Sequence, residues 1–126
     1  MKFLKLWVPV FSWAGLIFYL SSIPQLSTGW GIYDLILRKA AHITEYFILA
    51  WLLYRAFQGS FNLSFFSLFF WSFTLSFLYA LSDEVHQLFV FGRSCSSGDL
   101  AMDTLGIIVF FIFLRYRKLR LQKRGA

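Results

Sequence analysis

The residues of this chain that could take part in chemistry are concentrated in three short blocks. In chain order the blocks hold Arg38, Lys39, His42, Glu45 and Tyr46, then Asp83, Glu84, His86 and Gln87, then Arg93, Asp99 and Asp103. In a helix, Arg38, His42 and Glu45 fall at i, i+4 and i+7 and therefore share one face. Carboxylates, imidazoles and guanidinium groups held together in this way can transfer protons or bind an anion.

Acid–base chemistry would involve the carboxylates and histidines of the first two blocks. The candidate catalytic residues are Asp83, Glu84, His42 and Glu45. A low-dielectric setting can keep one carboxyl group protonated while a nearby cation keeps another ionised, which separates acid and base roles. No nucleophile elbow, phosphate-binding loop or metalloprotease motif accompanies them, so the sequence leaves open whether the protein is an enzyme.

Binding of an anionic group is the alternative chemistry for the same blocks. The candidate ligand-binding residues are Lys39, Arg93, Gln87, Asp99, Asp103 and Tyr46. Arg93 is the preferred anchor, because a guanidinium group matches the oxygens of phosphate and carboxylate. In a purely structural alternative, the same side chains form a salt-bridge network that pins helices together.

Metal binding is a less favoured alternative. The pairs His42-x-x-Glu45 and Asp83-x-x-His86 each place two ligands on one helical face, and together they could complete a four-ligand site. Such spacings arise often by chance, so the sequence predicts no bound metal or other cofactor. Because Cys95 is the single cysteine, an internal disulfide and a cysteine-based zinc cluster are excluded.

The composition indicates that these blocks are positioned by membrane helices. Of the 126 residues, 59% are hydrophobic and 22% aromatic, and a soluble domain of this size could not bury so much apolar surface. We therefore expect one transmembrane domain over residues 1–126. Its expected spans are approximately 6–23, 39–57, 62–84 and 97–115, followed by a basic tail over 115–126.

The second and fourth spans are too short without their charged residues. Only nine uncharged residues separate Glu45 from Arg55, and only eleven separate Asp103 from Arg115, whereas a spanning helix needs about 20. The second helix should therefore begin near Lys39 and the fourth near Ser97. Ionisable groups in such positions face a bundle interior or a wet cavity and are functional candidates.

The basic residues predict the orientation. With both termini inside, nine Lys and Arg residues lie on the cytoplasmic side and three on the outer side, as the positive-inside rule requires. The basic tail is then expected against anionic lipid and not on nucleic acid. The first span is expected to be an uncleaved anchor, with a signal peptide as the alternative. This topology brings the three blocks, with Ser21, Ser22 and Gln25, to the outer membrane face.

The blocks resemble the VanZ-like family of small bacterial membrane proteins. The similar segments are Ile17-Phe18-Tyr19-Leu20-Ser21-Ser22, Lys39-Ala40-Ala41-His42-Ile43-Thr44-Glu45-Tyr46, Ser82-Asp83-Glu84-Val85-His86-Gln87-Leu88-Phe89, Gly92-Arg93-Ser94 and Asp99-Leu100-Ala101-Met102-Asp103-Thr104-Leu105-Gly106. Phe91 stands where a proline is common in the family, and Ile107-Ile108-Val109 lacks the further glycine often seen after Gly106. Gly92 is expected to form a turn, and Gly106 a close helix contact.

The resemblance implies a multi-pass protein of the bacterial cytoplasmic membrane. The name-giving member is linked to resistance against teicoplanin-type glycopeptide antibiotics. We therefore expect an outward-facing site that recognises or acts on an amphiphilic cell-envelope molecule or a glycopeptide. The alternative is a non-catalytic scaffold or modulator. Membrane lipids are the expected partners, and the sequence predicts no oligomeric state.

Overall fold

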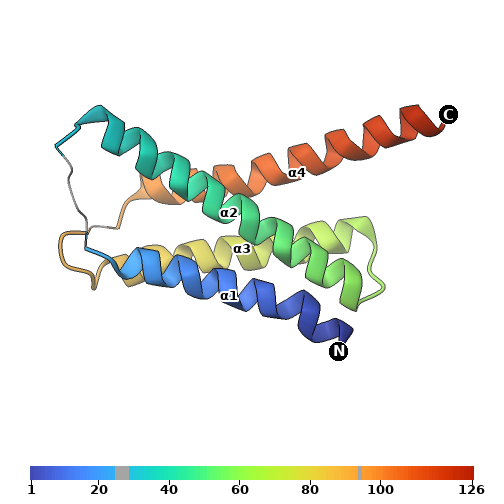
Figure 1. The fold of residues 1–126 in the computed structure, drawn as a ribbon, viewed down its shortest axis with the longest axis horizontal. Coiled ribbons are helices and arrows are strands. Elements are labelled where there is room, and N and C mark those ends of the chain that lie inside the picture. The colour runs from blue at the N-terminus through green and yellow to red at the C-terminus, as the bar shows by residue number, and fades with distance from the viewer. Residues whose placement is uncertain (25–28, 94) are drawn as a thin grey trace.

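The computed structural model describes residues 1–24, 29–93 and 95–126. Within these ranges the regular secondary structure is entirely α-helical, and short loops connect the helices. The four helices are α1 (Lys2–Ser22), α2 (Ile32–Ser60), α3 (Phe65–Gln87) and α4 (Ser97–Gly125) (Figure 1). The prediction of an all-α fold with four helices is therefore confirmed. Gln25 and Ser94, which belong to the predicted polar loops, lie outside the described residues.

Local sequence signals explain where the helices begin and end. Ser64 caps α3 by accepting a hydrogen bond from the backbone N–H of Ser67 at 3.2 Å, and Ser96 caps α4 in the same way through Asp99 at 3.4 Å. At the end of α1, Ile23 is extended, with φ −73° and ψ 127°. The residue after it is Pro24, and a residue before proline avoids the helical region.

Two helix boundaries differ from the predicted spans. α2 begins at Ile32 and not near Lys39, because no proline or glycine interrupts residues 32–39 and Asp34 lies favourably in the first turn. α4 continues as a helix through the basic tail to Gly125. The tail residues are good helix formers, and Lys118 Nζ lies 4.0 Å from the centre of the Phe65 ring.

α2 is the central helix of the bundle and packs against each of the other three. α1, α3 and α4 are long and apolar enough to cross a membrane, whereas α2 is not in that set. Its position explains the difference, because a helix surrounded by protein can carry polar residues that a lipid-facing helix cannot. On the outside, apolar side chains are strongly exposed, for example Phe66 at 73%. These features indicate a membrane protein.

The two ends of the bundle differ in chemistry. At one end the N-terminus of α1 meets the C-terminus of α2, where Trp7 Nε1 donates to Ser60 Oγ at 2.9 Å and Arg55 Nη2 donates to the Lys5 carbonyl at 3.2 Å. The C-terminus of α4 extends beyond this same end (Figure 1). At the opposite end lie the α1–α2 and α3–α4 loops, and we call it the polar end because it holds the three blocks.

Candidate functional site

Polar side chains from all four helices are buried together at the polar end. We call them the buried polar cluster, which comprises Ser21, His42, Asp83, Glu84, Gln87 and Asp103. Polar groups in such a setting must find partners, because an unpaired buried charge is strongly unfavourable. Their contacts therefore decide what the cluster can do.

His42 and Asp103 form the central pair of the cluster. His42 Nδ1 lies 2.7 Å from Asp103 Oδ1, and Asp103 is 0% exposed. A close approach of α2 and α4 brings the pair together: a Cβ at Gly106 would lie only 3.1 Å from Ile43 Cα and would clash with the Ile43 carbonyl. When Nδ1–H donates to the carboxylate, Nε2 remains available as an acceptor. The predicted close helix contact at Gly106 is confirmed.

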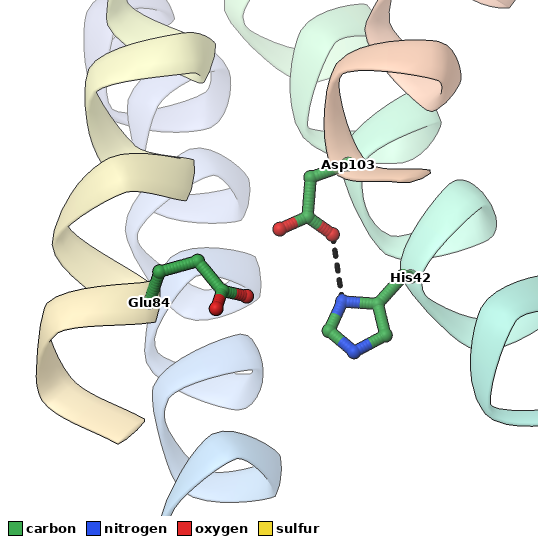
Figure 2. A group of neighbouring side chains, drawn as sticks. All are labelled: His42, Glu84 and Asp103. Atoms are coloured by element: carbon green, nitrogen blue, oxygen red, sulfur yellow. Dashed lines mark hydrogen bonds and ion pairs between the residues drawn. The ribbon is translucent and has the colours of Figure 1, made fainter. Parts of the chain in front are cut away.

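Glu84 faces this pair from α3 (Figure 2). Its Oε2 accepts a hydrogen bond from the backbone N–H of Ser96 at 3.0 Å. Its Oε1 is buried with no hydrogen-bond partner, and Asp103 Oδ2 is in the same state. Two carboxylate oxygens therefore point into the protein with unused acceptor capacity.

Arg93 joins the α3–α4 loop to the end of α1. Its Nε donates to the Ile23 carbonyl at 2.9 Å, and its Nη2 donates to the Leu20 carbonyl at 3.2 Å. Carbonyls at a helix C-terminus lack intrahelical donors, so a guanidinium group satisfies them well. The turn before Arg93 is closed by a hydrogen bond from the backbone N–H of Arg93 to the Val90 carbonyl at 3.1 Å. Gly92 has φ 75°, a conformation that favours glycine, which confirms the predicted turn.

Two adjacent cavities open beside the cluster. An inner cavity of about 80 Å³ is lined by Leu20, Ser21, Arg38, Ala41, His42, Glu45, Asp83, Gln87 and Arg93. An outer cavity of about 230 Å³ is lined by Leu35, Arg38, Lys39, Gln87, Arg93, Ser96 and Asp99. Because Arg38, Gln87 and Arg93 line both, the two cavities are adjacent. Three cationic side chains border the outer cavity.

Lys39 and Asp99 form an ion pair at the outer cavity. Lys39 Nζ lies 3.7 Å from Asp99 Oδ1, and the lysine side chain is 34% exposed. The aspartate side chain is 14% exposed, and a partly exposed pair at this long distance is weak. Lys39 can therefore exchange Asp99 for another anion at small cost.

The other predicted site residues lie around this centre. Glu45 lines the inner cavity, and its backbone carbonyl accepts a hydrogen bond from Trp13 Nε1 at 2.9 Å. Tyr46 is fully buried, and its hydroxyl has no hydrogen-bond partner. His86 is turned toward α1, where Nδ1 lies 3.4 Å from Ser21 Oγ and the ring stacks on Phe18 at 4.3 Å. The contacts of His86 are therefore with α1, whereas His42 contacts Asp103 of α4.

The potential metal ligands that come together in the structure differ from the predicted alternative set of four, which was His42, Glu45, Asp83 and His86. Among the described residues, His42, Glu84 and Asp103 form such a group, with ligand atoms within 4.8 Å of one another. The sequence identified all three as site residues but did not group them. The contribution of the Ser96 backbone was not predicted, because a backbone N–H leaves no side-chain signal.

Apolar grooves run along the α3–α4 face. A groove of about 400 Å³ is lined by Phe77, Ser97, Leu100, Ala101, Thr104, Leu105 and Ile108. A second groove of about 390 Å³ is lined by Phe65, Phe69, Phe73, Ile108, Phe111, Ile112 and Arg115. Ile108 lines both, so together they extend from the polar end toward the basic end of α4.

Comparison with known proteins identifies the family alone. The sequence model of the VanZ/LLP1 family matches residues 2–119, nearly the whole chain. No curated protein matches the chain, and no solved structure does.

Proposed function

The chain belongs to the VanZ/LLP1 family, and we propose that its polar end binds the anionic headgroup of an amphiphilic cell-envelope molecule. The observation that carries this proposal is the outer cavity, in which Arg38, Lys39 and Arg93 border a volume of about 230 Å³. Arginine and lysine together suit phosphate or carboxylate oxygens. A single water takes up about 30 Å³ in the liquid, so the cavity is large enough for such a headgroup.

The position of the apolar grooves favours an amphiphile over a soluble anion. The first groove begins at Ser97, directly after Ser96, which lines the outer cavity. A headgroup in the outer cavity could therefore extend its hydrocarbon chain along α3 and α4 toward Ile108. By family resemblance, a teicoplanin-type glycopeptide is one candidate ligand, and a lipid-linked phosphate is another.

We propose that all four helices span the bacterial cytoplasmic membrane, with the polar end outward and both termini cytoplasmic. The distribution of basic residues supports this topology, because nine of the twelve lie toward the opposite end. The central position of α2 also supports it, since α2 packs against the other three helices and its His42 is buried. The headgroup site would then face the outer leaflet.

A structural role for the cluster is the second candidate function. The His42–Asp103 pair links α2 to α4. The hydrogen bond from the Ser96 N–H to Glu84 links the start of α4 to α3. Arg93 links the α3–α4 loop to the end of α1. These contacts join all four helices at the polar end. In this alternative the protein is a scaffold or modulator that needs no ligand in the cavity.

Ligand binding tests the first candidate. The purified protein in detergent micelles is mixed with a polyprenyl monophosphate, and in parallel with the uncharged polyprenol of the same length. Native mass spectrometry then measures the fraction of protein with one lipid bound. We expect the phosphate to bind, and we expect Lys39→Gln to weaken it about tenfold, which corresponds to about 1.4 kcal/mol.

Arg115→Gln is the matched control, because Arg115 lies at the far end of the grooves. It should leave phosphate binding at the polar end unchanged. Equal binding of phosphate and alcohol, or an unchanged affinity in Lys39→Gln, would contradict a headgroup site formed by these cations.

Conservative substitutions separate the two candidates. Glu84→Gln is nearly isosteric and keeps an oxygen for the Ser96 N–H, so a chemical role predicts normal expression with loss of function. A scaffold role predicts that Glu84→Gln and Arg93→Lys lower expression equally. Membrane yield and a glycopeptide-sensitivity or envelope assay in cells measure the two effects.

A further inference from the structure

Three potential metal ligands converge from three different helices at the centre of the buried polar cluster. His42 comes from α2, Glu84 from α3 and Asp103 from α4, and all three are buried (Figure 2). One ligand atom of each lies within 4.8 Å of those of the other two. Because the helices are far apart in sequence, only the tertiary fold brings this set together.

Two oxygens of the set have unused acceptor capacity. Glu84 Oε1 and Asp103 Oδ2 are buried without a hydrogen-bond partner, and Glu84 and Asp103 are 2% and 0% exposed. In Figure 2 the Glu84 carboxylate faces the His42–Asp103 pair, and the second oxygen of Asp103 lies on the side of Glu84. A bound cation would satisfy both oxygens at once.

The surrounding charges also favour a cation. Asp83 belongs to the same buried polar cluster, and Glu45 lines the inner cavity beside His42. Two guanidinium groups, those of Arg38 and Arg93, also line the inner cavity, and that of Arg93 donates to carbonyls of α1. They are outnumbered by the four carboxylates of Glu45, Asp83, Glu84 and Asp103. A divalent ion would place two positive charges directly between the carboxylates of Glu84 and Asp103.

We propose that His42, Glu84 and Asp103 bind one divalent transition-metal ion of the Zn²⁺ or Mn²⁺ class. One imidazole nitrogen with two carboxylate oxygens suits these borderline ions better than Ca²⁺, which prefers oxygen ligands alone, or Cu⁺, which prefers sulfur. Three protein ligands leave at least one coordination position open, as in catalytic metal sites. Of the three ligands, His42 also lines the inner cavity.

Metal binding requires a small rearrangement of the central pair. Two ligands on a tetrahedral Zn²⁺ lie about 3.3 Å apart for bonds near 2.0 Å, whereas His42 Nδ1 and Asp103 Oδ1 are 2.7 Å apart. The ion therefore replaces the hydrogen bond, and the two side chains separate by a few tenths of an ångström. In a neutral ring the proton on Nδ1 moves to Nε2, and a ring protonated at both nitrogens releases one proton to solvent. Glu84 moves toward them with its free oxygen.

This site goes beyond the proposed headgroup function and does not depend on it. If both exist, His42 lies next to each of them, because it is a metal ligand that also lines the inner cavity. The two are separated experimentally because the probe for this site is the metal ion alone. Loss of polyprenyl phosphate binding with intact metal binding contradicts only the headgroup proposal, and the reverse result contradicts only the metal site.

Metal binding to the full-length protein in detergent tests the proposal. After treatment with a chelator and its removal, Zn²⁺ and Mn²⁺ are titrated by calorimetry, and bound metal is counted by elemental analysis. We expect one ion per chain and a rise in the thermal unfolding temperature of the wild-type protein. We expect Glu84→Gln and Asp103→Asn to weaken binding at least tenfold.

Glu45→Gln and His86→Gln are the matched controls, because they change nearby ionisable residues outside the proposed ligand set. Both should keep one metal ion per chain. Folded wild-type protein that binds no ion, and whose unfolding temperature metal does not raise, would overturn the proposal even if a ligand variant failed to fold. Binding lost in the two controls but kept in Glu84→Gln and Asp103→Asn would also overturn it.

Discussion

Asp103 is the residue whose chemistry depends most on its neighbours. It is fully buried in α4, and its close polar contact is with His42. Removal of one member of a buried pair leaves the other with an uncompensated charge or hydrogen-bonding group, which costs more than the pair contributes. The two residues should therefore be strongly coupled in folding stability.

A double-mutant cycle measures this coupling. We expect His42→Ala to lower the free energy of unfolding by about 3–5 kcal/mol, because Asp103 loses its partner. In the His42→Ala/Asp103→Asn double variant the charge is removed too, so the loss should be smaller than the sum of the two single losses. Reversible unfolding in mixed detergent micelles gives the three values, and simple additivity would contradict the coupling.

Residue types indicated which polar residues gather at the polar end, but the pairing of these residues could not be predicted. Adjacent Asp83 and Glu84 point about 100° apart on a helix, and the sequence does not specify which of them faces His42. In the structure Glu84 faces the His42–Asp103 pair, while Asp83 lines the inner cavity. A rotation of α3 about its axis by that angle would exchange these roles, so the three-ligand group appears only in the tertiary fold.

At the scale of the helices, the α2–α4 contact controls the geometry of the site. Gly106 packs so closely on the backbone of Ile43 that a Cβ has no room, and a backbone carbonyl cannot move aside as a side chain can. Ile43 follows His42, and Gly106 lies one turn after Asp103. Any separation of the helices at this point therefore also separates the central pair.

Substitution of Gly106 tests this contact. We expect Gly106→Ala to lower the free energy of unfolding by about 1–3 kcal/mol through overpacking and to weaken metal binding. Gly15→Ala in α1 is the matched control, since no atom lies within 4 Å of its added Cβ. It should be neutral or slightly stabilising. Equal effects of the two substitutions on detergent unfolding curves would contradict a tight contact.

The number of helices was predictable from the sequence, but the start of α2 was not. Long apolar runs identify α1 and α3. The apolar segments of α2 and α4 are too short to cross a membrane, so these two helices are recognised only when their charged residues are included. The predicted start of α2 near Lys39 was wrong, because the length needed to cross lipid sets only a minimum for the helix. The helix extends beyond that length to Ile32, since helix propensity does not stop at the edge of an apolar segment.

At the scale of the whole molecule, the orientation in the membrane determines which molecules can reach the polar end. The natural sequence offers a direct probe, because Cys95 is its single cysteine and is exposed in the α3–α4 loop. If the polar end faces outward, a membrane-impermeant maleimide added to intact cells should label Cys95. Gel analysis of the labelled protein measures the extent of reaction.

The opposite end provides the control for the same experiment. In the Cys95→Ser/Ala126→Cys variant the thiol lies at the end of α4, and we expect labelling only after the cells are permeabilised. A single chain cannot place both thiols on the same side if α4 crosses the membrane. Labelling of both in intact cells would therefore exclude α4 as a span. Labelling of the Ala126→Cys thiol alone would invert the topology and turn the candidate site toward cytoplasmic ligands.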